Sequence, residues 1–143
     1  MPETNRAIAG AANPAGDRPP VPAHPAEING SLLTVSEECV GRRAVLSVTG
    51  EVDISNAKDL GAAIESTAAR ASELWLDLSA LTFMDSSGLN ALADTRVRLI
   101  EANVRLTLIC PEGPVRRVLA LAGFDRIFEI HATRSAADLS TPA

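Results

Sequence analysis

Apolar residues recur along the chain with two different periods, and these periods predict strands and helices in alternation. Short runs rich in Leu, Val and Ile predict strands at residues 32–35, 44–49, 74–78, 104–108 and 127–130. Apolar or small residues spaced three and four positions apart predict helices at residues 56–70, 85–100 and 115–122, with a weak terminal helix at 135–139. The order therefore starts with two strands and continues with helix and strand in turn.

Two of the predicted helices have an apolar stripe, and the third has a clear end. The stripe of the first helix consists of Ala57, Leu60, Gly61, Ile64 and Ala68. The stripe of the second helix consists of Leu89, Leu92, Ala93, Val97 and Ile100. Ser55 or Asn56 is available as the N-cap of the first helix. Gly123 follows the third helix, where a left-handed residue commonly ends the element.

This order predicts an α/β fold with a mixed, mostly parallel sheet and alternating helices. Strands separated by a helix pair in parallel, because the helix carries the chain back to the edge where the previous strand began. Residues 38–42, which lie between the first two strands, predict a hairpin loop and therefore an N-terminal antiparallel hairpin. Residues 74–78 form a nearly continuous apolar run, as expected for a strand covered on both faces.

The N-terminal residues differ in composition from the rest of the chain, which predicts a boundary near residue 30. Six of the nine prolines lie within residues 1–30, among Ala, Gly and Asn. Such a segment buries too little apolar surface to offset the entropy of ordering it. We therefore expect a disordered tail at residues 1–30 and one folded domain at residues 31–143.

Composition and charge argue against several classes of protein. The apolar share of 46% supports a hydrophobic core, while the formal net charge of −5 argues against binding to nucleic acid or to an anionic membrane. No apolar run is long enough to span a bilayer, and the N-terminus lacks the apolar stretch of a signal peptide. We therefore expect a cytoplasmic protein without a membrane span.

The most distinctive polar residues follow the predicted strand that begins at residue 74. Asp85, Ser86, Ser87 and Gly88 open the second predicted helix. One interpretation is structural, because amides at a helix start lack intrahelical partners and Asp and Ser side chains accept hydrogen bonds from them. Two observations favour a functional site. Two serines exceed what one cap requires, and open α/β sheets carry their sites beyond the carboxyl ends of strands.

Residues 81–89, Leu-Thr-Phe-Met-Asp-Ser-Ser-Gly-Leu, resemble the signature of bacterial anti-sigma factor antagonists of the STAS family. The run Gly-Glu-Val-Asp at residues 50–53 resembles another element of that family, and residues 114–124 resemble its third helix and following turn. The resemblance extends from Ser31 to the C-terminus. It departs from the family pattern at Asn90, where many relatives have glycine.

The resemblance implies a STAS fold and a regulator without enzymatic activity or cofactor. In the family, the anti-sigma factor is a histidine-kinase-like serine kinase, and it phosphorylates the serine that corresponds to Ser86. The unphosphorylated protein binds the anti-sigma factor and thereby releases the sigma factor, while a serine phosphatase is a further partner. The expected partner-binding residues are Ser86 with Asp85, Ser87 and Gly88, together with Asp53 on a loop at the same edge of the sheet.

Two other classes of function are open alternatives. A STAS domain also serves as a scaffold or sensor that binds a nucleotide, a lipid or another regulator without phosphorylation of Ser86. An enzyme is the weakest class, because the sequence has no GxxxxGK[ST], GxGxxG or HExxH motif and neither histidine stands in a triad pattern. An acidic cluster of Asp53, Asp77 and Asp85 is disfavoured, because Asp77 lies within a strand predicted to be buried.

The two cysteines, Cys39 and Cys110, lack the spacing of a metal site, and no metal is expected. Cys110 ends a predicted strand, which favours a buried thiol. Cys39 lies in the predicted hairpin loop, so a redox role through a disulfide with Cys110 is a minor alternative.

Overall fold

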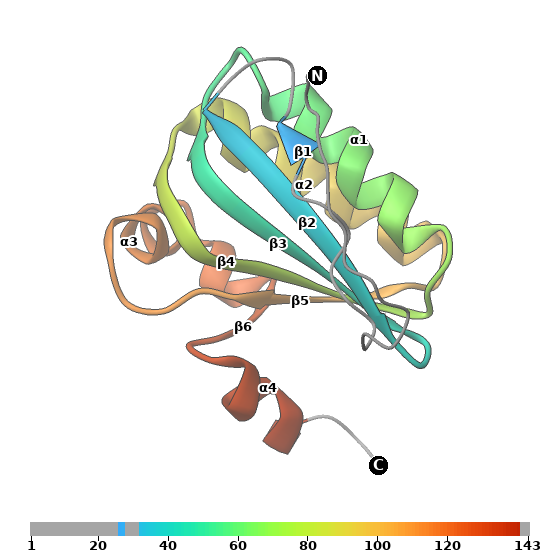
Figure 1. Ribbon diagram of the computed structural model, residues 1–143. Helices are drawn as coiled ribbons and strands as arrows, with labels where there is room; N and C mark the ends of the chain where they lie inside the picture. Colours follow the sequence, from blue (N-terminus) through green and yellow to red (C-terminus); the bar gives the residue numbers. More distant parts are fainter. Residues whose placement is uncertain (1–25, 28–31, 141–143) are drawn as a thin grey trace, which may run out of the picture.

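The computed structural model describes residues 26–27 and 32–140, which form one sheet with helices packed against it (Figure 1). The sheet contains six strands in the order β1-β2-β3-β4-β5-β6. The strands are β1 (Ala26–Glu27), β2 (Leu33–Val40), β3 (Arg43–Val52), β4 (Glu73–Met84), β5 (Arg105–Ile109) and β6 (Glu129–His131). The helices are α1 (Ala57–Ala68), α2 (Ser86–Glu101), α3 (Pro114–Leu121) and α4 (Arg134–Ser140), with a 3₁₀ turn at Phe124–Arg126.

The strand pairing is antiparallel at one side of the sheet and parallel across the rest. β2 pairs antiparallel with β1 and with β3, whereas the pairs β3–β4, β4–β5 and β5–β6 are parallel. This pairing confirms the predicted α/β class and the predicted antiparallel hairpin. β4 lies between β3 and β5, and its residues 74–78 are all buried, as their apolar run predicted.

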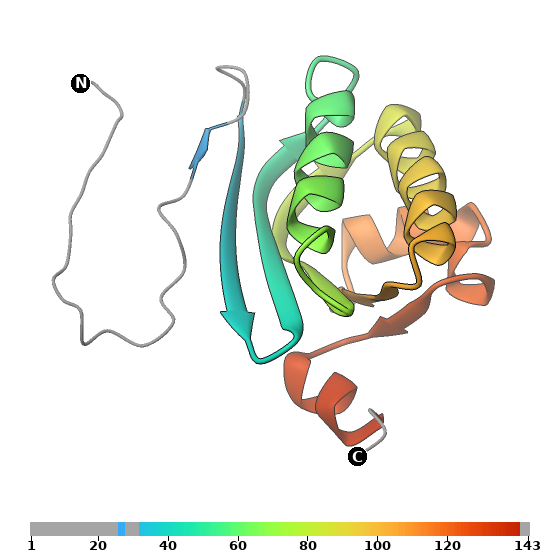
Figure 2. The same ribbon diagram turned by 90° about the vertical axis from the view of Figure 1, so that its right-hand side faces the viewer.

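Helices α1, α2 and α3 cover one face of the sheet (Figure 2). Every second side chain of β3 and β4 points into this layer, because successive strand residues face opposite sides. These side chains include Ala44, Leu46 and Val48 of β3 and Leu74, Leu76 and Leu78 of β4. The stripe predicted for the first helix is buried completely in α1. The main core therefore lies between the sheet and these three helices.

α4 covers part of the opposite face of the sheet and encloses a smaller core. This core consists of Val45, Trp75, Ile109 and Ala137. The guanidinium of Arg43 lies 3.8 Å from the centre of the Trp75 ring, which gives a cation–π contact at the rim of the small core. The short terminal helix, which was a weak prediction from the sequence, is therefore packed on the sheet.

A polar network fastens the start of α4 to the sheet. Arg134 Nε donates to Asp77 Oδ2 at 2.7 Å, and Arg134 Nη2 donates to the Ser47 hydroxyl at 3.0 Å. The Ser79 amide donates to Asp77 Oδ1 at 2.9 Å. Burial by itself raises the pKa of Asp77, but the hydrogen bonds from Ser79 and the charge of Arg134 outweigh burial and lower the pKa. Asp77 is therefore a structural carboxylate in the middle of β4.

The hairpin between β2 and β3 is tighter than predicted. Residues 38–40 belong to β2 and pair with residues 43–45, so only Gly41 and Arg42 form the turn. Gly41 has a φ of 63°, which glycine adopts without strain at the first position of a two-residue hairpin turn. The predicted loop was too long because polar residues also occupy strands, where they face solvent.

The buried stripe of α2 also differs from the predicted one. It consists of Gly88, Leu92, Thr95 and Leu99. Val97 and Ile100 are 52% and 56% exposed, so their assignment to the buried stripe was wrong. A glycine and a threonine face the core in place of larger apolar residues, and a stripe chosen by hydrophobicity misses them. The last strand also starts later than predicted, at Glu129, because the amides of Ile127 and Phe128 donate to the Phe124 carbonyl oxygen of the preceding 3₁₀ turn and do not pair with β5.

Two residues of the predicted N-terminal tail belong to the sheet. Ala26 and Glu27 pair with Val35 and Thr34 of β2. The other residues of the predicted tail lie outside the described residues, and their disorder stays a prediction. Within the part of the chain that the structure describes, no helix is long and apolar enough to cross a membrane.

Candidate functional site

Two loops that follow neighbouring strands meet at the carboxyl-terminal edge of the sheet. Val52 is the last residue of β3 and pairs with Met84, the last residue of β4. The Asp85 amide also donates to the Val52 carbonyl oxygen at 3.3 Å. Asp53 and Asp85 therefore leave the sheet beside each other, and the geometry brings together the two loops that contain the expected site residues.

β4 reaches this edge with a bend that the sequence did not reveal. Residues 47–49 of β3 face residues 77–80 of β4, and residues 50–51 face residues 81–83. In both places β4 contains one residue more than β3, which is a β-bulge. Bulges bend a strand and increase its twist, so they direct the end of β4 and the start of α2 toward the loop after β3.

Asp85 is the N-cap of α2. It has an extended backbone, with φ −106° and ψ −168°, and its Oδ1 accepts hydrogen bonds from the amides of Ser87 at 2.9 Å and Gly88 at 3.4 Å. These amides have no intrahelical partner, so the carboxylate satisfies them and also stabilises the positive end of the helix dipole. The structural interpretation of the motif is therefore confirmed for Asp85.

Ser86 is the first residue of α2, and its side chain is not needed for the cap. The residue is exposed, and among the described residues its hydroxyl has no hydrogen-bond partner. Ser87 is half-buried and contributes its amide to the cap. The tandem serines thus differ in their surroundings, and only Ser86 presents an exposed hydroxyl at the helix N-terminus. A helix N-terminus tolerates an added phosphate, because its amides and dipole favour negative charge.

Gly88 is buried beneath the first turn of α2. A Cβ at this position would lie 2.5 Å from Met84 Cγ and 2.9 Å from Val52 Cγ1, both of which are too close. The missing side chain therefore lets α2 pack directly against the ends of β3 and β4. The close approach that the sequence suggested is thus made by the protein's own side chains, and Gly88 shapes the site from below.

The loop after β3 is held in place by its own polar side chains. Asp53 Oδ1 accepts from the Ser55 amide at 2.9 Å and from the Ser55 hydroxyl at 2.6 Å. These hydrogen bonds lower the pKa of Asp53, so the carboxylate is ionised at neutral pH. Asn56 links the loop to β3, because its Oδ1 accepts from the Asp53 amide and its Nδ2 donates to the Glu51 carbonyl oxygen, each at 3.0 Å.

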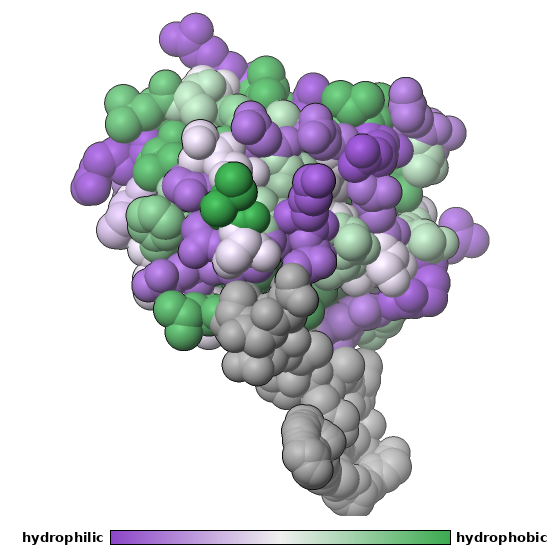
Figure 3. Space-filling view, turned by 90° about the horizontal axis from the view of Figure 1, so that it is seen from above, coloured by the Kyte–Doolittle hydropathy of each residue, from purple (hydrophilic) through white to green (hydrophobic). Residues whose placement is uncertain are grey.

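Two exposed apolar side chains accompany these polar groups, and they were not singled out from the sequence. Ile54 directly follows Asp53 and is 84% exposed, and Phe83 lies two residues before Asp85 and is 47% exposed. Figure 3 shows this side of the molecule, where hydrophobic groups stand among hydrophilic ones. An isoleucine inside a polar loop was the feature of the sequence that could have indicated these exposed apolar side chains. A protein interface has an apolar core within a polar rim, and two exposed apolar side chains among charged groups match this arrangement.

The two cysteines are free thiols at different places in the sheet. Cys39 is exposed but lies within β2, which corrects the predicted loop position, whereas Cys110 is buried directly after β5. β2 and β5 are separated by β3 and β4, so the two Cα atoms are farther apart than the roughly 7 Å that a disulfide spans. The disulfide alternative is therefore excluded within this fold. Burial raises the pKa of the Cys110 thiol.

The order of strands and the paired loops define the class of protein to which this chain belongs. It is a member of the STAS domain family, whose model matches residues 33–137. The match begins at the start of β2 and ends within α4, so it includes both loops of the site. Residues 26–27, which form β1, lie outside the match.

Several individual members of this family are similar to the chain. The chain is similar to the anti-sigma-F factor antagonist RsfB of Mycobacterium tuberculosis, with 37% identity over 91 residues that cover 63% of this chain and 74% of RsfB. A solved anti-sigma factor antagonist from Mycobacterium paratuberculosis has 31% identity and a TM-score of 0.69, covering 76% of this chain and 92% of that one. The unphosphorylated form of the anti-sigma factor antagonist SpoIIAA shares the fold, with 24% identity, a TM-score of 0.60 and coverage of 73% and 93%.

Proposed function

We propose that this protein is an anti-sigma factor antagonist whose binding is switched by phosphorylation of Ser86. The observation that carries the proposal is the exposed hydroxyl of Ser86 at the N-terminus of α2, beside a cap that is complete without it. The relatives named above, RsfB and the Mycobacterium paratuberculosis protein, are anti-sigma factor antagonists. By this analogy, the partner is an anti-sigma factor, which the unphosphorylated protein binds so that the sigma factor is released.

The expected kinase is the anti-sigma factor itself, a histidine-kinase-like serine kinase that transfers the γ-phosphoryl group of ATP to Ser86 Oγ. A serine phosphatase would restore the hydroxyl. The loop after β3 contains Asp53 and the exposed Ile54, and the first turn of α2 contains Ser87. We assign these three residues to the surface that the partner contacts. The protein needs no catalytic group of its own for this cycle.

Phosphorylation is expected to act on binding and to leave the fold intact. A phosphoserine adds about −1.5 to −2 charges, which the N-terminus of α2 accommodates. Asp53 and Asp85 already place negative charge at this edge, so the phosphate increases it and opposes an acidic or apolar partner surface. Loss of one well-buried partner contact costs about 2 kcal/mol or more, which weakens a complex about 30-fold.

The test measures affinity for the kinase-type anti-sigma factors of the same genome, with and without ATP, together with the phosphorylation site by mass spectrometry. We expect ATP to phosphorylate Ser86 and to weaken binding at least about 30-fold. Ser86→Ala should bind and resist phosphorylation, whereas Ser86→Asp should bind weakly. Ser87→Ala is the matched control, because the backbone amide of Ser87 makes the cap contact, and it should still be phosphorylated at Ser86.

Equal affinity of the wild-type protein, Ser86→Ala and Ser86→Asp would contradict the switch. If no anti-sigma factor binds and Ser86 is never modified, the scaffold or sensor alternative replaces the proposal.

A further inference from the structure

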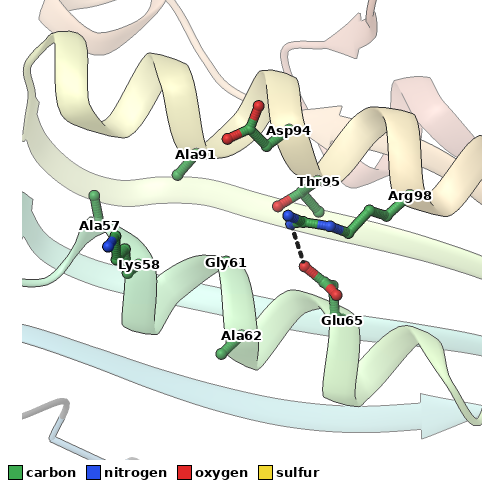
Figure 4. A pocket seen from close by; sticks show the side chains of 9 residues that line it. All are labelled: Ala57, Lys58, Gly61, Ala62, Glu65, Ala91, Asp94, Thr95 and Arg98. Atoms are coloured by element: carbon green, nitrogen blue, oxygen red, sulfur yellow. Dashed lines mark hydrogen bonds and ion pairs between the residues drawn. The ribbon is translucent and has the colours of Figure 1, made fainter.

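A groove runs between α1 and α2, which lie side by side and both begin at the edge of the sheet that contains Ser86 (Figure 2). The groove has a volume of about 490 Å³. Figure 4 shows the side chains that line it, which come from both helices. This size is comparable with pockets that hold ligands or parts of a partner. Its walls include four small residues: Ala57, Gly61 and Ala62 from α1 and Ala91 from α2. Small side chains allow another chain to approach the helices closely.

The groove begins near Ser86 and extends along α1 and α2 toward their C-terminal ends. Its first lining residues, Ala57 and Ala91, lie four residues after Asp53 and five residues after Ser86. At the other end, Arg98 Nη1 donates to Glu65 Oε2 at 2.7 Å, and this ion pair bridges the two helices (Figure 4). The distance along α1 from Ala57 to Glu65 is about 12 Å, the length of roughly two helical turns.

Two unpaired charges of opposite sign line the groove between its ends. Lys58 belongs to α1 and Asp94 to α2, and both residues are exposed. Within residues 26–27 and 32–140, neither side chain forms an ion pair or a hydrogen bond. Because both charges are available, the groove is complementary to an occupant that carries a carboxylate toward Lys58 and a cation toward Asp94.

A buried polar group lies at the floor of the same groove. Thr95 is 1% exposed, and its hydroxyl has no hydrogen-bond partner among the described residues. It faces Gly61, where an added Cβ would lie 3.5 Å from the hydroxyl oxygen. An unsatisfied buried hydroxyl destabilises the free protein, and a polar atom of an occupant reaches it only if α1 and α2 separate slightly at Gly61 and Thr95 on binding.

We propose that this groove receives a segment of the anti-sigma factor that presents an acidic side chain to Lys58 and a basic side chain to Asp94; the proposal rests on the proposed function. The groove opens at the edge where phosphate on Ser86 must disturb the complex, so one partner contacts both. A second copy of this chain is a poorer occupant, because a symmetric dimer would place groove against groove and two concave surfaces do not fill each other.

The test measures affinity of variants for the anti-sigma factor that binds the wild-type protein. Lys58→Glu and Ala62→Arg should each weaken binding at least about tenfold, through charge repulsion and through filling of the groove. Arg117→Glu and Ala120→Arg are matched controls on exposed positions of α3, and they should change affinity less than about twofold. The double variant Lys58→Glu/Asp94→Lys keeps the net charge but should still bind weakly, because the local charges are reversed.

The role of the Thr95 hydroxyl is tested by Thr95→Val, which removes it at nearly constant volume. Thr107→Val is the matched control, because Thr107 is also 1% exposed with an unpartnered hydroxyl but does not line the groove. Only Thr95→Val should weaken binding, by about threefold or more. Circular dichroism checks that each variant is folded.

The possible failures are distinguishable. If the wild-type protein binds and responds to phosphorylation but Lys58→Glu and Ala62→Arg bind equally well, the groove proposal is wrong and the Ser86 switch stands. If no anti-sigma factor binds the wild-type protein, both proposals fail. If sedimentation shows a dimer that Ala62→Arg dissociates without changing the affinity for the anti-sigma factor, the occupant is a second copy and the proposal is overturned.

Discussion

Asp85 and Ser86 are neighbours in the sequence, yet their side chains have different surroundings at the start of α2. The carboxylate accepts from two backbone amides, and the hydroxyl next to it is exposed. Either residue type makes a good N-cap, so the motif alone left both possibilities open. The choice depends on the backbone, because only the residue with an extended conformation before the first helical turn can reach the amides of the second and third helical residues.

Gly88 and Gly61 provide a prediction at the scale of single residues. An added Cβ at Gly88 would meet Met84 and Val52 at 2.5 and 2.9 Å, whereas at Gly61 it would meet only the Thr95 hydroxyl at 3.5 Å. Alanine also favours a helix by up to about 1 kcal/mol over glycine. We therefore expect Gly88→Ala to lower the free energy of unfolding by about 1–2 kcal/mol, because overpacking outweighs the helix preference.

Gly61→Ala is the matched control, since both glycines are buried on the core side of a helix. It should raise the free energy of unfolding by up to about 1 kcal/mol. Urea unfolding measures both variants. Equal effects of the two substitutions would show that the contact of Gly88 with the strand ends does not constrain α2.

At the scale of elements, α4 depends on the pair formed by Arg134 and Asp77. The pKa of Asp77 is lower in the folded protein than in the unfolded chain, so its stabilising contribution is complete about one pH unit above the unfolded pKa of about 3.9 and is lost as the pH falls through the lower folded value. We expect Asp77→Asn to cost on the order of 2 kcal/mol at pH 7, where hydrogen bonds to a charged acceptor are lost.

The same substitution should also reduce the dependence of stability on pH. Between pH 5 and pH 3, the free energy of unfolding of Asp77→Asn should fall less than that of the wild-type protein, as measured by chemical unfolding. Asp125→Asn, an exposed position in the 3₁₀ turn, serves as control and should stay within about 0.5 kcal/mol of the wild-type protein. A wild-type pH profile in Asp77→Asn would mean that α4 is not held by this carboxylate.

At the scale of the whole molecule, the strand order separates the two thiols. Cys39 lies on β2 and Cys110 after β5, with β3 and β4 between them. We therefore expect the melting temperature and the affinity for the anti-sigma factor to be equal, within error, in dithiothreitol and under mild oxidation of the monomer. A reductant-dependent shift that Cys39→Ser abolishes without any covalent dimer would contradict this strand order.

The order and type of the helices and strands from β2 to α4 were determined by the sequence, because the spacing of apolar residues reports local backbone geometry; β1 and the 3₁₀ turn were not predicted. The stripe of α1, the buried run of β4 and the mixed, mostly parallel sheet all followed from this spacing. The N-cap at Asp85 also followed from the residues that open α2, and the candidate site at this helix start is a prediction from the same residues. These features depend on segments of about 5 to 15 residues, within which the side chains of one face recur at a known period.

Only the tertiary structure decided which distant segments meet. The register of β3 against β4 places Asp53 beside Asp85, and the bulges that bend β4 depend on that pairing. Packing of α2 on the strand ends buries Gly88, packing against α1 places the buried Thr95 opposite Gly61, and Val97 is left exposed. Strand register and helix rotation are global properties, since they maximise burial over the whole core. The spacing of residues within one segment therefore cannot determine them.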